Sequence, residues 1–375
     1  MPVILLLHNR YRTLGGEERV VGELERLIPA EIGEEAVLLE RDSASASPAT
    51  AGAALLRGGS DPDEVAAVVR RTGARVAHAH NLLPQLGWRA LAAARSAGAR
   101  TVLTLHQYRL VCAAGTCLDS RGQDCLRCHG RDTRPGIRLN CRGGSRAEAA
   151  LYAASLSRWS ARMVEEADAL TVPSQFTLER LRALGAPIEG REVTVVPNPV
   201  FPATKLADPP AGGYAICSAR LAPDKGVDLA IEACALAGRP LVVTGHGPRE
   251  AEYRALAARL GAVVTFAGRV SEEELADLRA GAAIAIVPSR FAETFGLSAA
   301  ESMAAGLPVV AFDVGALGEL LDAEDLAPPA DPAALGALID ARWGDAARGA
   351  AYRERIAERA SPAVVARGLA TVYDG

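Results

Sequence analysis

Residues 282–310 read AAIAIVPSRFAETFGLSAAESMAAGLPVV, and this stretch decides the fold. An apolar run near Ala283–Val287 leads into a loop with Pro and Gly, and a helical segment begins near Gly296. A second apolar run, Val309–Phe312, follows directly after Pro308. A buried strand, a helix and another buried strand in this order are typical of a parallel α/β sheet.

The same alternation runs along all 375 residues. A segment rich in Pro and Gly, residues 197–213, interrupts it. We therefore predict two similar Rossmann-like domains that face one another across a cleft, at 1–203 and 204–355, with a helical tail at 356–375. The other expected strands lie at Val3–His8, Ala36–Glu40, Val76–His80, Thr101–His106, Ala169–Val172, Val193–Val196, Tyr214–Ser218, Leu241–Thr244 and Val263–Ala267.

The composition is that of a globular protein, with 49% apolar and 23% charged residues. The net charge of −4 is too small to indicate a partner. The apolar run at residues 1–7 has no basic segment before it and is too short for a signal peptide or a membrane span. We therefore expect a soluble, cytoplasmic protein.

The loop at 219–226 follows an expected strand and carries Arg220 and Lys225. Only two of the 41 basic residues are lysines, which draws attention to Lys225. We expect Asp224 to cap the next helix and to leave both cations beside its N-terminus, an arrangement that suits a diphosphate. Two solvated surface cations are the alternative.

The loop after Val287 contains Glu293 and, eight positions later, Glu301. Gly296 allows close backbone approach where the helix starts, and the first amides of a helix can bind phosphate oxygens. Glu301 lies in a small, apolar segment, where a ribose diol would satisfy its carboxylate. Otherwise it is a glutamate favoured by the helix dipole.

With both loops in view, the second half resembles the donor-nucleotide domain of the retaining glycosyltransferases of family four, which have the GT-B fold. The resemblance rests on Arg220-Leu221 with Lys225-Gly226, on Gly245-His246-Gly247-Pro248, and on the run from Pro288 to Glu301. Ala219 stands where the family commonly has Gly. The resemblance implies that Arg220 and Lys225 hold the donor diphosphate and that Glu301 binds the ribose. It also implies that Gly247 lines the donor site. The donor sugar would be contacted by Glu293 and by the amides of Phe295, Gly296 and Leu297.

The first half supports the same resemblance. Gly15 and Gly16 open a helix and are similar to the family's glycine loop, which approaches the donor phosphates. His106 corresponds to a histidine that contacts the donor sugar, although Gln107 stands where the family often has Asp. His78 and His80 are interpreted as ordinary structural residues. In the family the C-terminal tail crosses back to the first domain.

The resemblance implies transfer from a UDP- or GDP-sugar, with retention, to an acceptor bound by the first domain. A small molecule, a lipid-linked intermediate and a glycan are all open as the acceptor. The expected mechanism is front-face substitution, which requires no cofactor or metal. A sugar-nucleotide epimerase of the same fold and a non-catalytic nucleotide-sugar-binding protein are the alternatives.

Five of the seven cysteines lie between residues 112 and 141, inside an expected insertion at 107–145. Cys125 and Cys128 have the spacing of a metal-binding pair, and Cys112 and Cys141 complete a set of four. We expect a structural zinc, in which Cys117 or His129 can replace one ligand. A disulfide and uncoordinated thiols are the alternatives.

Residues 121–162 carry nine arginines against three acidic residues, a local charge of +6. This segment is either a solvated face or a surface that attracts an anionic acceptor, such as a lipid diphosphate at a membrane. It lacks the interleaved aromatic residues of single-strand binders, so no nucleic-acid partner is expected.

Overall fold

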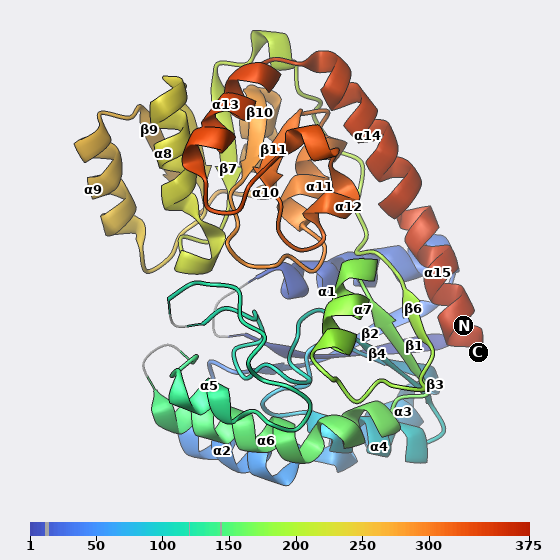
Figure 1. The fold of residues 1–375 in the computed structure, drawn as a ribbon. Helices are drawn as coiled ribbons and strands as arrows, with labels where there is room; N and C mark the ends of the chain where they lie inside the picture. The colour runs from blue at the N-terminus through green and yellow to red at the C-terminus, as the bar shows by residue number, and fades with distance from the viewer. Residues whose placement is uncertain (12–14, 120, 143–144) are drawn as a thin grey trace. The chain divides into compact units, whose positions relative to one another are not determined.

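The computed structural model describes residues 1–11, 15–119, 121–142 and 145–375 (Figure 1). Its contacts divide the chain into two compact units, residues 1–199 with 362–375, and residues 200–361. The expected domain boundaries, after residues 203 and 355, lie within a few residues of the boundaries of these units. Each unit contains a six-stranded sheet whose strands pair in parallel, which confirms the predicted fold class of two Rossmann-like domains.

The sheet of the first unit has the order β2-β1-β3-β4-β5-β6. Its strand β1 is apolar from Val3 to Leu7 and fully buried from Ile4 to Asn9, because helices cover both faces of a parallel sheet. The strands are β1 (Val3–Arg10), β2 (Glu35–Asp42), β3 (Ala74–Ala79), β4 (Arg100–Thr104), β5 (Ala169–Val172) and β6 (Val193–Val195). The helices are α1 (Gly16–Leu27), η1 (Ile28–Ile32), α2 (Pro48–Arg57), α3 (Pro62–Thr72), α4 (Gly87–Ser96), α5 (Arg134–Arg138), α6 (Arg146–Glu165), α7 (Gln175–Ala183) and α15 (Pro362–Asp374).

The sheet of the second unit has the order β12-β11-β10-β7-β8-β9. Its strand β10 is buried along its whole length between β11 and β7. The strands are β7 (Tyr214–Ser218), β8 (Leu241–Thr244), β9 (Val264–Gly268), β10 (Ala282–Val287), β11 (Val309–Phe312) and β12 (Leu326–Ala327). The helices are η2 (Pro209–Ala211), η3 (Pro223–Lys225), α8 (Val227–Ala237), α9 (Glu250–Leu260), α10 (Glu272–Ala280), α11 (Leu297–Ala304), α12 (Leu317–Leu320), η4 (Ala323–Asp325), α13 (Pro332–Arg342) and α14 (Ala346–Ala360).

Helix α2 is an element that sequence reasoning passed over. Its start signals are nevertheless present, because the Ser47 hydroxyl accepts a hydrogen bond from the Thr50 amide and Pro48 occupies the first turn. The left-handed Gly58 ends the helix. Its small Ala and Gly residues give it a weak apolar stripe, which explains why periodicity alone did not indicate a helix.

The tail forms two helices, and α15 packs in the first unit against η1 and β4. The Tyr373 hydroxyl lies 2.8 Å from His78 Nδ1 in the buried interior. The side chain of Arg100 donates to the carbonyl of Val372 at 3.0 Å. Residues 362–374 therefore complete the core of a unit whose other residues lie at the opposite end of the chain.

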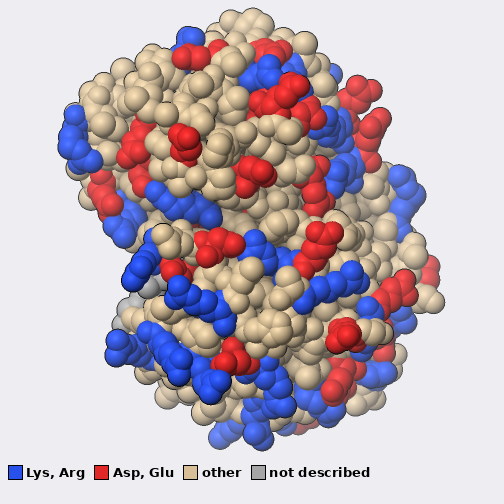
Figure 2. Space-filling view, in the orientation of Figure 1, with Lys and Arg blue, Asp and Glu red and all other residues tan. Residues whose placement is uncertain are grey.

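Figure 2 shows blue side chains gathered over the part of the first unit that carries α5 and α6, the region to which the basic segment of residues 121–162 belongs. Several of these arginines are paired with carboxylates, including Arg134 with Asp132 at 2.7 Å and Arg162 with Glu165 at 3.0 Å. Within the described ranges, no helix is long and apolar enough to cross a membrane. Attraction of an anionic acceptor to this face remains a prediction.

Candidate active site

Three loops of the second unit meet at the carboxyl ends of the adjacent strands β10, β7 and β8. The Leu221 amide donates to the carbonyl of His246, and the Arg290 amide donates to the carbonyl of Asp224, both at 3.0 Å. A Cβ on Gly247 would lie 2.3 Å from the carbonyl oxygen of Leu221. Glycine is therefore required there for the loops to approach one another, at the sheet edge where α/β folds bind ligands.

Lys225 and Glu293, both predicted site residues, form an ion pair across two of these loops. Lys225 Nζ donates to Glu293 Oε1 at 2.7 Å, and the Ser289 hydroxyl donates to the same oxygen at 2.6 Å. Both charged side chains are mostly buried, with exposed fractions of 25% and 12%. The pair holds a cation and a carboxylate in fixed positions beside the helix that begins at Val227.

The expectation that Asp224 caps the following helix is wrong. A short turn, Pro223–Lys225, comes first, and α8 begins at Val227 with Gly226 in the left-handed conformation at its N-cap. Asp224 instead accepts a hydrogen bond from Arg220 Nη2 at 2.9 Å. Arg220 remains 41% exposed, so this predicted diphosphate ligand is accessible while its partner orients it.

Helix α11 begins after a glycine N-cap, which has no side chain to accept from the first amides. Gly296 occupies the N-cap with a φ of 92°, and a Cβ there would lie 2.7 Å from Leu317 Cδ2. Phe295 is buried beneath this turn, and Leu297 is the first helical residue. The first amides of a helix can bind an anion, so the contact of Phe295, Gly296 and Leu297 with the donor stays a prediction.

Glu301 occupies the second turn of α11, but it has a protein partner there. The Arg279 side chain donates to its Oε2, and both side chains are nearly buried. A ribose bound by Glu301 would therefore share the carboxylate with Arg279. Sequence reasoning did not foresee this partner, which lies on the separate helix α10.

The first unit contains a cavity of about 50 Å³ lined by His80 and His106, among other residues. His106 follows β4 and is held by the preceding amide, which donates to the Thr171 carbonyl at 2.8 Å. Its Nε2 lies 2.8 Å from His80 Nδ1. Burial lowers the pKa of His106 to about 3 and that of His80 well below its ordinary value, so both rings are neutral at pH 7.

Tyr11, Glu17 and Arg109 also line this cavity. The Tyr11 hydroxyl donates to Glu17 Oε2 at 2.8 Å, and the Arg109 guanidinium lies 4.6 Å from the centre of the Tyr11 ring. Burial raises the pKa of the Glu17 carboxyl. Sequence reasoning assigned no role to these three residues and interpreted His80 as an ordinary structural residue. The available signal was that two consecutive expected strands, Val76–His80 and Thr101–His106, both end in histidine.

The predicted glycine loop forms the start of α1 as expected. Gly15 is the N-cap, and its amide donates to Glu18 Oε2 at 2.8 Å; Gly16 is the first helical residue. Gly15 has an extended backbone, and a Cβ there would meet only the Glu18 side chain at 3.5 Å. The local fold therefore does not require glycine at this position, which leaves room for a role in ligand approach.

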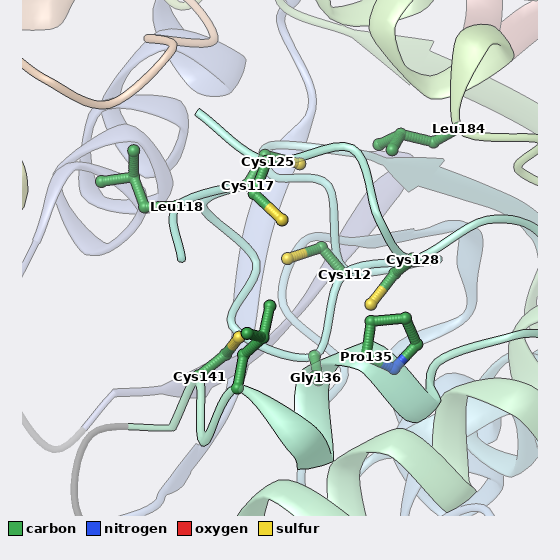
Figure 3. Close-up of a pocket in the computed structure, with 11 residues that line it drawn as sticks. Cys112, Cys117, Leu118, Cys125, Cys128, Pro135, Gly136, Cys141 and Leu184 are labelled. Carbon is green, nitrogen blue, oxygen red and sulfur yellow. The ribbon is translucent and has the colours of Figure 1, made fainter. Parts of the chain in front are cut away.

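Five cysteines of the insertion line a second cavity of the first unit, of about 10 Å³ (Figure 3). The four predicted zinc ligands are among them, and Cys117 is the fifth. The Cys112 and Cys117 sulfurs point toward one another, and the hydrogen bond that Cys117 donates lowers the pKa of the Cys112 thiol to about 6. Across the described part of the chain, no three His, Cys, Asp or Glu side chains are arranged to hold a metal ion.

Two units, each built on a parallel six-stranded sheet, are the architecture of the GT-B class. Residues 11–199 match the model of the glycosyl transferase 4-like domain, and residues 205–361 match that of the glycosyl transferases group 1. The chain therefore belongs to the family-four, group 1 glycosyltransferases.

Matches to individual curated proteins cover only part of the chain. The chain is 30% identical over 239 residues to the GDP-mannose-dependent monoacylated alpha-(1-6)-phosphatidylinositol monomannoside mannosyltransferase of Corynebacterium glutamicum, a match that covers 50% of this chain and 61% of the relative. The matches cover between 21% and 61% of the length of three curated relatives.

Among solved structures, sucrose-phosphate synthase from Thermosynechococcus elongatus superposes with a TM-score of 0.72 at 19% identity, over 100% of this chain and 98% of that one. HepE from Anabaena in complex with UDP superposes with a TM-score of 0.65 at 17% identity, over 100% of both chains. These structures share the fold of this chain.

Proposed function

We propose that this chain transfers a sugar from a UDP- or GDP-sugar to a hydroxyl acceptor and retains the anomeric configuration. The observation that carries the proposal is the fixed pair of Lys225 with Glu293, which lies in the loop that leads to the glycine N-cap of α11. A cation and free helix amides suit a diphosphate, and a carboxylate suits sugar hydroxyls. The mannosyltransferase relative is named for GDP-mannose, and the HepE structure contains UDP, which supports a donor of this type.

In this proposal the acceptor oxygen forms a bond to the anomeric carbon while the bond from that carbon to the diphosphate oxygen breaks. The acceptor proton passes to the departing diphosphate on the same face of the sugar. Arg220, Lys225 and the α11 amides stabilise the negative charge that develops on the diphosphate. Glu293 and His106 contact the transferred sugar, and Glu301 binds the ribose. Gly15, Gly16 and Gly247 leave room for the donor.

The proposal is tested by incubating the full chain with UDP-glucose, UDP-N-acetylglucosamine or GDP-mannose, each labelled in the sugar, with and without a panel of hydroxyl acceptors. Nucleoside diphosphate release together with an α-linked product is the expected result. The one-bond coupling between the anomeric carbon and its proton in the NMR spectrum of the product reports retention, for a mannoside as well as for a glucoside. An isomerised donor without transfer indicates an epimerase, and donor binding without any conversion indicates a non-catalytic protein; either result overturns the proposal.

The thiol cavity is proposed to hold one structural zinc through Cys112, Cys125, Cys128 and Cys141, with Cys117 available as a replacement. The support is chemical, because thiols that line one cavity are the donors zinc prefers. Backbone amides also donate to the sulfurs of Cys112 and Cys128, as they do around metal-bound thiolates. The thiols must turn toward a common centre on binding. Reduced, metal-bound thiols fit the cytoplasmic location that we also propose.

A further inference from the structure

One ring nitrogen of His80, in the first unit, lacks a hydrogen-bond partner among the described residues. The residue is 5% exposed and lines the cavity it shares with His106. Its Nδ1 is engaged with His106, but its buried Nε2 has no hydrogen-bond partner in the described structure. Buried polar atoms are nearly always bonded, so an unbonded nitrogen on a residue that lines a cavity indicates a partner that a bound molecule supplies. Because Nε2 itself is covered in the ligand-free protein, the cavity wall must shift to admit that partner.

The hydrogen bond between the His80 and His106 rings couples the tautomeric states of the two residues. Two neutral imidazoles in contact share one N–H between them. If His80 Nδ1 carries that proton, His106 Nε2 accepts it, and both rings are Nδ1–H tautomers with His80 Nε2 an acceptor. If His106 Nε2 carries it, both rings are Nε2–H tautomers and His80 Nε2 is a donor. In either case His80 Nε2 and His106 Nδ1 have opposite hydrogen-bonding character.

We infer that His80 Nε2 binds a hydroxyl of the sugar acceptor, and that this contact sets the tautomer of His106. The inference rests on the proposed function, which places the acceptor in the first unit. A hydroxyl that donates its proton to Nε2 holds both rings as Nδ1–H tautomers, so that His106 Nδ1 becomes a donor. Acceptor binding thus presents His106 as a hydrogen-bond donor to the other substrate.

A neutral hydroxyl fits this position better than an ion. The His80 ring is uncharged, and the charged groups on the cavity wall, Glu17 and Arg109, already interact with one another and with Tyr11. A volume of about 50 Å³ has room for a hydroxyl and its adjoining carbon. The ligand class is therefore a sugar, cyclitol or other polyol that inserts one hydroxyl-bearing edge.

The test reads the tautomers directly in the full chain labelled with ¹⁵N-histidine, whose six histidines are assigned by single substitutions. Long-range ¹⁵N–¹H NMR at pH 7 should show His80 and His106 as the same tautomer. Three hydroxyl probes, methyl α-D-glucopyranoside, myo-inositol and glycerol, are then titrated. At least one should shift His80 Nε2 and move both rings to the Nδ1–H form. Opposite tautomers, or no response to any of the three, overturn the inference.

Two variants separate the contact from general packing. The His80→Asn side chain can still reach His106 but has nothing in place of Nε2, so probe affinity should fall about tenfold. The control is His78→Asn, two positions earlier and inside β3. The His78 ring also packs on His80, with ring centres 4.2 Å apart, but its nitrogens bond instead to Tyr373 and Thr104, so this variant should change probe affinity less than about twofold. Equal losses in both variants contradict the inference. Because no sugar transfer is needed, this result is independent of whether the donor assay succeeds.

Discussion

The ammonium of Lys225 lies 2.7 Å from the carboxylate of Glu293, although 68 positions separate the two residues. Lys225 belongs to the loop after β7 and Glu293 to the loop after β10, so the pair ties together two neighbouring strand ends. The Phe291 ring, 5.1 Å from Lys225 Nζ, covers the cation on another side. A compact ammonium fits this enclosed position, whereas a planar guanidinium has a different shape and reach.

Lys225→Arg should therefore lower turnover about tenfold although the charge is kept, and Lys225→Ala and Arg220→Ala should lower it about a hundredfold. Initial rates of nucleoside diphosphate release measure the effect. The control is Lys205→Arg, which changes the other lysine, an exposed partner of Asp277 on the surface. Near-normal rates in all the Lys225 and Arg220 variants would remove the diphosphate assignment.

Gly226→Ala should destabilise the second unit by about 3 kcal/mol, from backbone strain and a clash together. Gly226 has a φ of 64°, and a Cβ there would lie 1.9 Å from the carbonyl oxygen of Pro288. Gly238 ends the same helix at a φ of 62°, and a Cβ added there would meet nothing within 4 Å, so Gly238→Ala should cost only about 1 kcal/mol. Urea unfolding compares the two, and equal losses contradict the role of close loop approach.

Stability should decrease as the pH falls below about 6.5, the ordinary pKa of histidine. Burial lowers the pKa of both His78 and His106 to about 3, so the unfolded chain binds protons that the folded chain excludes. Their contribution is complete above pH 6.5 and is lost progressively toward pH 3. At pH 5 each of these two histidines lowers the free energy of unfolding by about 2 kcal/mol. Urea unfolding at pH 7 and at pH 5 measures this loss of stability. The His78→Gln variant should show a smaller difference in unfolding free energy between the two pH values. Equal stability at both pH values would be the contrary result.

Protein purified without chelators should contain about one equivalent of zinc, and Cys128→Ser should reduce this strongly. Cys234→Ser is the control, because Cys234 is a buried thiol of the second unit, outside the cavity. Metal analysis and a thiol titration decide between the alternatives. Less than about half an equivalent of zinc counts against the site, and a mass two hydrogens lower then indicates a disulfide.

The strands of both sheets could be predicted because parallel strands are apolar on both faces, as the run at the start of β1 illustrates. The positions of Lys225 and Glu293 followed from the rule that loops after such strands carry ligands. Partners across the sheet were harder to predict. The pairing of Glu301 with Arg279 and of His80 with His106 depends on which elements become neighbours, and local patterns do not record strand order.

Helix α15 has a consequence for how the protein is made. The histidine-bearing sheet of the first unit receives Tyr373 as the partner of His78, so this unit lacks part of its core until residues 362–374 have left the ribosome. The second unit, which is continuous from 200 to 361, can fold before the first one is complete. A fragment that stops at residue 199 should therefore expose the apolar surface that α15 covers and aggregate, whereas adding residues 362–375 as a separate peptide should restore its solubility.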